Sequence, residues 1–154
     1  MLAVAALATG VAAWAVAGAP AAATADGLLD FEVRGDAVPA ALGGLIGAAS
    51  RGRAIVIDRR EGNCMICHHL PIEEQPFQGE LGPPLDAVGA RLSEGQIRLR
   101  LLDQSLLNPD TLMPPYYRVR GLTNVASEYR GQPALDAQQI EDVVAYLTTL
   151  KASP

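Results

Sequence analysis

The two cysteines of this 154-residue chain lie three positions apart, in the stretch REGNCMICHHLP, and a histidine directly follows the second cysteine. Two thiols at this spacing can add to the two vinyl groups of haem and form two thioether bonds. The next side chain then lies under the iron as an axial imidazole ligand. The pattern therefore predicts one covalently bound haem c, attached through Cys64 and Cys67, with His68 on the iron.

Three other uses of a closely spaced cysteine pair explain the stretch less well. A structural disulfide stabilises most when it closes a long loop, and two intervening residues close almost none. A thioredoxin-like dithiol accompanies a strand-helix-strand pattern, whereas the residues around CMIC show Gly, Pro and helical periodicity. A tetrahedral zinc ion needs four ligands, but the two cysteines and two histidines crowd into six positions, with no second cluster elsewhere.

Met113 is the predicted second axial ligand. Of the other methionines, Met1 lies in the leader, and Met65 lies inside the attachment turn on the wrong side of the ring. Met113 stands in NPDTLMPPYY, where two prolines forbid a helix and stiffen an extended loop that can carry a thioether across the haem face. Histidine–methionine pairs are a standard arrangement in cytochromes c. A methionine that fills a gap in the core is the alternative.

Two residues near the cysteines complete this prediction. A ligating imidazole usually donates its other N–H to a fixed acceptor. Pro83, in QGELGPPLDAVGARL, has a carbonyl held in a rigid turn, so we expect this carbonyl to accept from His68, with a plain loop as the alternative. His69 points about 100° away from His68 on a helical turn. It therefore cannot share the iron from the same face, and we expect it at the surface or at the haem edge, with a role as the sixth iron ligand as the alternative.

The first 25 residues carry no charge and are interpreted separately from the fold. Their small, apolar composition, with Ala23 and Ala25 just before a possible cleavage site at Asp26, predicts a signal peptide over residues 1–25 and export to the periplasm. The basic residue that usually opens such a signal is missing. An uncleaved anchor is the alternative, because the apolar run is long enough to cross a bilayer.

Composition and periodicity indicate what positions the site. With 49% hydrophobic and 19% charged residues, the chain suits one small globular domain. Residues 26–49 contain scattered Gly and Pro and are expected to form an irregular lead-in to a domain over residues 50–151. The last helix is the clearest, since apolar residues recur at helical spacing up to Leu150. Capping residues predict the starts of three helices, at Ser50, at Ser93 with Gln96, and at Asp136.

The stretches RGRAIVIDRREGNCMICH, GELGPPLDAVGARL, NPDTLMPPYY and GQPALDAQQIEDVVAYL together resemble SoxX, the monohaem cytochrome subunit of the SoxAX complex of bacterial sulfur oxidation. The attachment motif alone indicates only a cytochrome c. Three further patterns narrow the resemblance to SoxX. They are DRR-GNC before and at the first cysteine, NP-T-MP-Y around Met113, and DVVAYL in the last helix. It implies an all-α, class I cytochrome c-like fold, with thioether sites at Cys64 and Cys67 and axial ligands at His68 and Met113.

The resemblance also implies a partner and a division of labour. SoxX-like chains pair with SoxA, a haem subunit that couples thiosulfate oxidatively to a cysteine on a sulfur-carrier protein. Because haem attachment uses both cysteines here, we expect this chain to take up electrons and pass them to a further acceptor, such as another cytochrome c. The catalytic chemistry of this thiosulfotransferase is then expected on the partner. A free-standing periplasmic electron shuttle is the alternative, and a sensor haem protein with an open sixth site fits the Met113 loop less well.

The charged residues add little about partners. The net charge of -5 argues against nucleic-acid binding. Most basic residues are arginines, which are favoured at protein interfaces, so those near the attachment motif are expected at a partner interface or on a solvated face. They are Arg51, Arg53, Arg59, Arg60, Arg91, Arg98 and Arg100.

Overall fold

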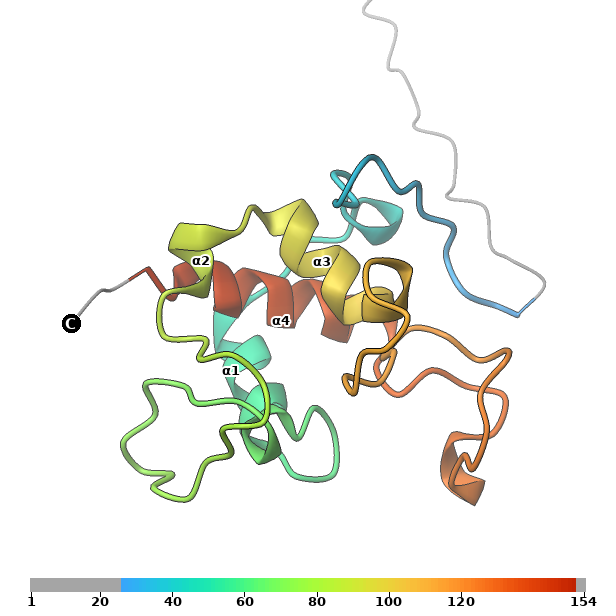
Figure 1. Ribbon diagram of the computed structural model, residues 1–154. Helices are drawn as coiled ribbons and strands as arrows, with labels where there is room; N and C mark the ends of the chain where they lie inside the picture. Colours follow the sequence, from blue (N-terminus) through green and yellow to red (C-terminus); the bar gives the residue numbers. More distant parts are fainter. Residues whose placement is uncertain (1–25, 152–154) are drawn as a thin grey trace, which may run out of the picture.

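Helices and loops make up the described part of the chain, residues 26–151 of a computed structural model (Figure 1). This part has no strand beyond one isolated bridge between Arg34 and Ala37, so the all-α prediction is confirmed. None of its helices is both long and apolar enough to cross a membrane. The predicted signal peptide over residues 1–25 lies outside the described residues.

The α-helices are α1 (Ala49–Ile57), α2 (Val88–Arg91), α3 (Glu94–Asp103) and α4 (Ala137–Thr149). Short 3-10 turns are η1 (Leu42–Gly44), η2 (Cys64–Ile66), η3 (Gln104–Leu106) and η4 (Ser127–Tyr129).

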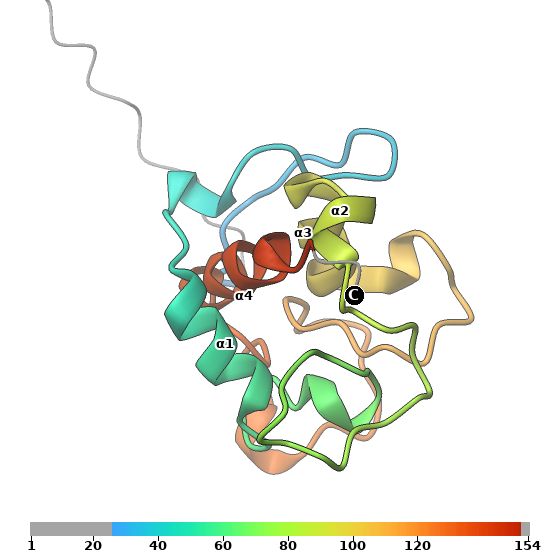
Figure 2. The same ribbon diagram turned by 90° about the vertical axis from the view of Figure 1, so that its left-hand side faces the viewer.

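Helix α4 lies at the centre of the helical part and contacts α1, α2 and α3 (Figures 1 and 2). Its predicted start is confirmed, because Asp136 and Gln139 form a reciprocal capping box. The apolar stripe predicted for this helix is buried against its neighbours. Helix α1 crosses α4 at very short range, since a β-carbon on Gly52 would overlap the backbone of Asp142. Only glycine permits this approach.

The start of α1 differs from the prediction at Ser50. The helix begins at Ala49, and its N-cap residue, Ala48, provides no side-chain cap. Instead the Ala48 N–H donates to Asp142 Oδ1 of α4 over 2.7 Å, and the Arg51 guanidinium donates to both oxygens of the same carboxylate. A cap from another helix therefore replaces the local serine. The predicted capping box of α3 is present, with Ser93 and Gln96 as its two partners.

A buried ion pair fastens the N-terminal segment to α3 and α4. Arg98 and Glu141 are paired at 2.8 Å with side chains only 3% exposed. Arg98 also donates to the Val38 carbonyl, and Glu141 accepts from the Leu42 N–H. The prediction that Arg98 lies at an interface or on a solvated face is therefore wrong, because this guanidinium lies in the core. Residues 26–49 are irregular apart from η1 and the bridge, yet Val38 and Leu42 belong to the core.

Candidate haem-binding site

The segment from Gly62 to His68 forms a tight turn, and four residues separate it from the end of α1. The Gly62 N–H donates to the Ile55 carbonyl over 3.2 Å, which joins the turn to the end of that helix. The N–H groups of Cys67 and His68 then both donate to the Cys64 carbonyl, over 3.2 and 3.0 Å. One turn of chain therefore presents both thiols and the imidazole. Both cysteines are free and half-buried.

The His68 ring is fixed by a hydrogen bond to a backbone carbonyl. Its Nδ1 lies 2.8 Å from the Pro83 carbonyl oxygen, the acceptor named from the sequence. Because a carbonyl only accepts, the proton of the neutral ring lies on Nδ1, which leaves the lone pair of Nε2 available for a metal. No described residue forms a hydrogen bond with Nε2. The donor set fits an iron-bound imidazole.

Gly82 forms a cradle for the His68 ring. A β-carbon built on this glycine would lie 2.6 Å from Nδ1 and 2.9 Å from Nε2, well inside contact distance. The backbone at Gly82 therefore lies against the imidazole, and any side chain there would displace it. This contact was not predicted, although the glycine before the double proline in GELGPPL was a signal of a close backbone approach.

The segment that carries Gly82 and Pro83, residues 79–85, is held by hydrogen bonds at both ends and in its middle. Its backbone N–H groups donate to carbonyls of the attachment turn at regular intervals. The pairs are Gly79 to Met65 at 2.8 Å, Gly82 to Cys67 at 2.7 Å and Leu85 to His69 at 2.8 Å. The Arg91 guanidinium also donates to the Pro84 carbonyl over 2.7 Å. The position of the imidazole acceptor is thus set by several independent hydrogen bonds.

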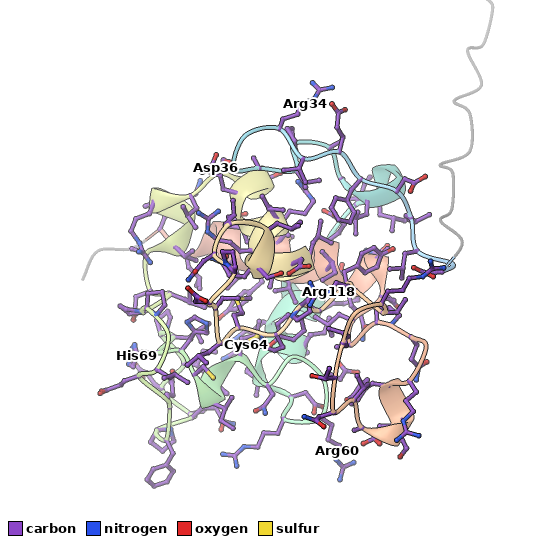
Figure 3. All side chains as sticks on the ribbon, turned by 45° about the vertical axis from the view of Figure 1, so that its right-hand side comes forward. Arg34, Asp36, Arg60, Cys64, His69 and Arg118 are labelled. Atoms are coloured by element: carbon purple, nitrogen blue, oxygen red, sulfur yellow. The ribbon has the colours of Figure 1, made fainter. Side chains whose placement is uncertain are left out.

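His69 lies at the surface and pairs with a carboxylate. Its side chain is 55% exposed, and its Nδ1 lies 3.1 Å from both carboxylate oxygens of Asp86. Figure 3 shows His69 at the edge of the molecule and Cys64 among the interior side chains. Of the two expected positions for His69, the structure favours the surface.

Met113 lies in a loop that is tied to the attachment turn. Its side chain is half-buried against the core, and its N–H donates to Thr111 Oγ1 over 3.1 Å. Three residues later, the Tyr116 hydroxyl donates to the Gly62 carbonyl over 2.7 Å. Met65, in contrast, is buried in the core at 7% exposure. The role of Met113 as a ligand stays a prediction, but its loop contacts the turn that holds the cysteines.

A role for Tyr116 at this site was not predicted from the sequence. The only signal was its place directly after Met113 and the two prolines. Its ring lies beside Cys64 as well as Gly62. Burial raises the pKa of the Cys64 thiol to about 11, and the hydrogen bond with Tyr116 only partly offsets this effect. Burial and the neighbouring Cys64 also raise the pKa of Tyr116. Before haem is attached, both groups are therefore neutral at physiological pH.

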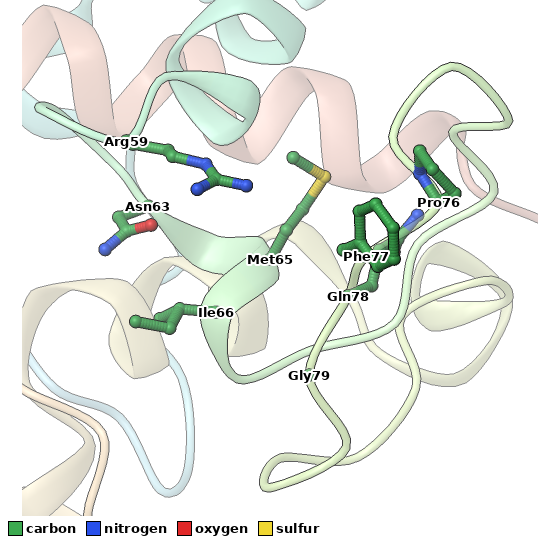
Figure 4. A pocket seen from close by; sticks show the side chains of 8 residues that line it. All are labelled: Arg59, Asn63, Met65, Ile66, Pro76, Phe77, Gln78 and Gly79. Atoms are coloured by element: carbon green, nitrogen blue, oxygen red, sulfur yellow. The ribbon is translucent and has the colours of Figure 1, made fainter.

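Exposed apolar side chains border the attachment turn. A cavity of about 500 Å³ lies beside the turn, and Figure 4 shows Met65 between Arg59 and Phe77 on its wall. Ile66, Phe77 and Leu81 are 67%, 86% and 68% exposed. We call these three residues the apolar rim. Large apolar residues that cluster on a surface are typical of an interaction site.

Most of the arginines expected at an interface have partners inside the chain. Besides the buried Arg98, Arg51 pairs with Asp142, and Arg53 pairs with Glu74. Arg91 and Arg100 donate to backbone carbonyls. Within the described residues, the guanidinium groups of Arg59 and Arg60 are the ones of this set that make no hydrogen bond or ion pair. Of these seven arginines, Arg59 and Arg60 are therefore the two whose guanidinium groups are available to a partner without breaking a contact inside the chain.

Comparisons with known proteins agree with this geometry. The family model described as Cytochrome c matches residues 49–151, which include both cysteines, both histidines and Met113. A search of solved structures finds a chain in the crystal structure of SoxXA from P. pantotrophus, with 35% sequence identity and a TM-score of 0.72. The match covers 85% of this chain and 100% of that chain. The search of curated proteins found no match.

Proposed function

Since this chain belongs to the cytochrome c family and is a SoxX-like c-type cytochrome, we propose that it is the electron-accepting subunit of a SoxAX-type complex. The predicted cytochrome c-like fold is confirmed by the family match and by the structural match. Membership implies a covalently bound haem c and a role in electron transfer. The proposal adds the reaction that the complex serves, which is the oxidative joining of thiosulfate to a cysteine of a sulfur-carrier protein.

We assign the residues that would hold a single haem as follows. Cys64 and Cys67 form the thioethers, His68 is the proximal ligand and Met113 the distal ligand. The Pro83 carbonyl fixes the proximal imidazole in the tautomer that leaves Nε2 for iron. When bound, the haem supplies a one-electron iron couple. The hydrogen bond from His68 Nδ1 to Pro83, with the Gly82 cradle beside it, is the observation that carries this assignment.

The cysteine count supports the division of labour. Joining thiosulfate to a thiol forms a sulfur–sulfur bond and releases one proton and two electrons. The chain has no third cysteine with which to make that bond. The bond-forming step therefore belongs to a SoxA-like haem subunit, and this chain carries the electrons away one at a time to another acceptor, such as a further cytochrome c. The predicted signal over residues 1–25 supports a periplasmic location for the complex.

Isolation from the host tests the proposal. We expect the chain to co-purify with a larger haem subunit at equal stoichiometry, and to show no thiosulfate-conjugating activity alone. A free-standing periplasmic shuttle is the second candidate, and recovery as a lone monomer at low salt would favour it. The match to a chain of the SoxXA crystal structure over that chain's whole length favours the complex.

The apolar rim is the surface we assign to the haem partner. Electron transfer needs a close approach to the attachment turn. Ile66 of the rim lies in this turn, and Phe77 and Leu81 lie in the segment that is hydrogen-bonded to it. Phe77→Ser should weaken co-purification and leave the absorption spectrum unchanged. Ile46→Ser is the matched control, because Ile46 is equally exposed at 86% but adjoins α4 at Gln138. Equal loss of the partner in both variants would contradict this assignment.

A further inference from the structure

Residues 108–117 form the loop that carries Met113, which we call the methionine loop. Within the described part of the chain, Tyr116 is the residue of this loop whose side chain forms a hydrogen bond with the attachment turn. Its hydroxyl donates to the Gly62 carbonyl over 2.7 Å, across 54 positions of sequence. Gly62 lies two residues before Cys64, and its N–H donates to the Ile55 carbonyl of α1. The hydroxyl stays protonated at physiological pH, because burial raises the pKa of Tyr116.

The backbone of Tyr116 is as firmly fixed as its side chain. Its N–H donates to the Leu101 carbonyl of α3 over 3.1 Å, and its carbonyl accepts from the Leu135 N–H over 3.1 Å. The next side chain points the other way, since the Tyr117 hydroxyl accepts from the Leu29 N–H in the N-terminal segment. In an extended segment, successive side chains point to opposite sides of the backbone. Tyr116 alone of the two tyrosines reaches the attachment turn.

Two prolines transmit this fixed position to the predicted ligand. Pro114 and Pro115 are the only residues between Met113 and Tyr116, and their rings restrict the backbone to extended conformations. A movement of Tyr116 relative to Gly62 therefore moves Met113 with it. The two predicted axial ligands come from different segments, and the Tyr116 hydroxyl links these segments directly.

We infer that Tyr116 is a positioning residue that holds the Met113 loop at a fixed distance from the turn carrying His68, and thereby resists displacement of the methionine by outside ligands. This inference rests on the proposed role of Met113. The role assigned to Tyr116 is positioning, through its hydrogen bond to Gly62, and is neither ligation nor electron transfer. The residue acts by limiting how far the loop moves when the sulfur leaves the metal.

Imidazole binding to the ferric holoprotein tests the inference, because imidazole must displace the methionine. Tyr116→Phe keeps the ring and removes only the hydroxyl. We expect imidazole to bind about 2- to 12-fold more tightly to this variant, the factor that corresponds to one lost hydrogen bond. The far-red sulfur-to-iron band should also disappear at a lower temperature than in the wild type.

Tyr129→Phe is the matched control. The Tyr129 hydroxyl donates to the Arg60 carbonyl over 2.9 Å, so it braces the chain two residues before the attachment turn from η4 but is not part of the methionine loop. Imidazole affinity in this variant should change less than 2-fold. Equal effects in both variants would overturn the inference, because any brace on the turn would then serve.

Two further outcomes separate this inference from the proposed function. If Met113→Ala abolishes the far-red band but Tyr116→Phe leaves imidazole affinity unchanged, the positioning role fails and the ligand assignment stands. If Met113→Ala leaves the band intact, the ligand assignment fails first. Loss of haem attachment in Tyr116→Phe, with normal attachment in Tyr129→Phe, would also overturn the inference, since the hydroxyl would then act on Cys64 before ligation.

Discussion

Replacing Gly82 with alanine tests whether the His68 cradle is required. The added methyl carbon would lie 2.6 Å from Nδ1 and 2.9 Å from Nε2, so either the ring or the Gly79–Leu85 backbone must move. Overpacking of this kind costs about 1–3 kcal/mol. Displacing the ring also weakens the bond to Pro83, a loss of about 0.5–1.5 kcal/mol.

One effect acts in the opposite direction. Gly82 is not among the described glycines with positive φ, so alanine fits the backbone conformation and reduces the entropy of the unfolded chain. This stabilises by about 0.4–1 kcal/mol. The net expectation is a loss of about 0.5–4 kcal/mol, with a central value of about 2 kcal/mol. For a domain of this size, that central value lowers the melting temperature by about 8 °C.

Thermal unfolding of the purified holoprotein measures this loss, and the reduction potential reports on the ring itself. Glu80→Ala is the control, because Glu80 is exposed in the same segment and its replacement should change stability by less than about 0.5 kcal/mol. If Gly82→Ala matched the wild type in both melting temperature and potential, the backbone would not constrain the imidazole, and the argument from the cradle would be wrong.

The other predictions concern attachment, the distal ligand and the core. Cys64→Ala should leave one thioether or prevent maturation, whereas the wild-type haem should resist acid-organic extraction; extraction of free haem from the wild type would refute covalent attachment. Met113→Ala should lower the reduction potential and remove the far-red band, and Met65→Leu should retain both, as absorption and redox titration would show. Glu141→Gln should cost about 3–5 kcal/mol in denaturant unfolding, because it leaves the Arg98 charge buried without its partner; a smaller loss would mean that water reaches the guanidinium.

The features that were predicted correctly are those encoded over a few residues. Two thiols and an imidazole in five positions have few chemical uses, so the attachment motif needed no knowledge of the fold. The capping boxes at Ser93 and Asp136 are equally local, since both partners of each box lie three residues apart. Periodicity identified the buried face of α4 for the same reason.

The features that were missed depend on residues far apart in the chain. Ser50 does not cap α1 because the helix already begins at Ala49, and the N–H of its N-cap residue, Ala48, donates to Asp142, more than ninety residues away. Arg98 is buried because Glu141 lies opposite it on α4. A single sequence shows the type of each residue but not which distant partner meets it, so a buried guanidinium cannot be told from a solvated one.

The attachment turn combines these local and distant contributions. The spacing of its cysteines and histidine is local, but its position is set by hydrogen bonds with α1, with residues 79–85 and with Tyr116. Tyr129 adds a hydrogen bond to Arg60, two residues before the turn. A short turn with half-buried thiols could not hold one conformation alone, because few of its own contacts offset the loss of chain entropy. With these braces the imidazole orientation exists in the folded polypeptide, so the ligand does not have to be reoriented when the iron changes charge. An electron-transfer protein benefits directly from a site that moves little between its two oxidation states.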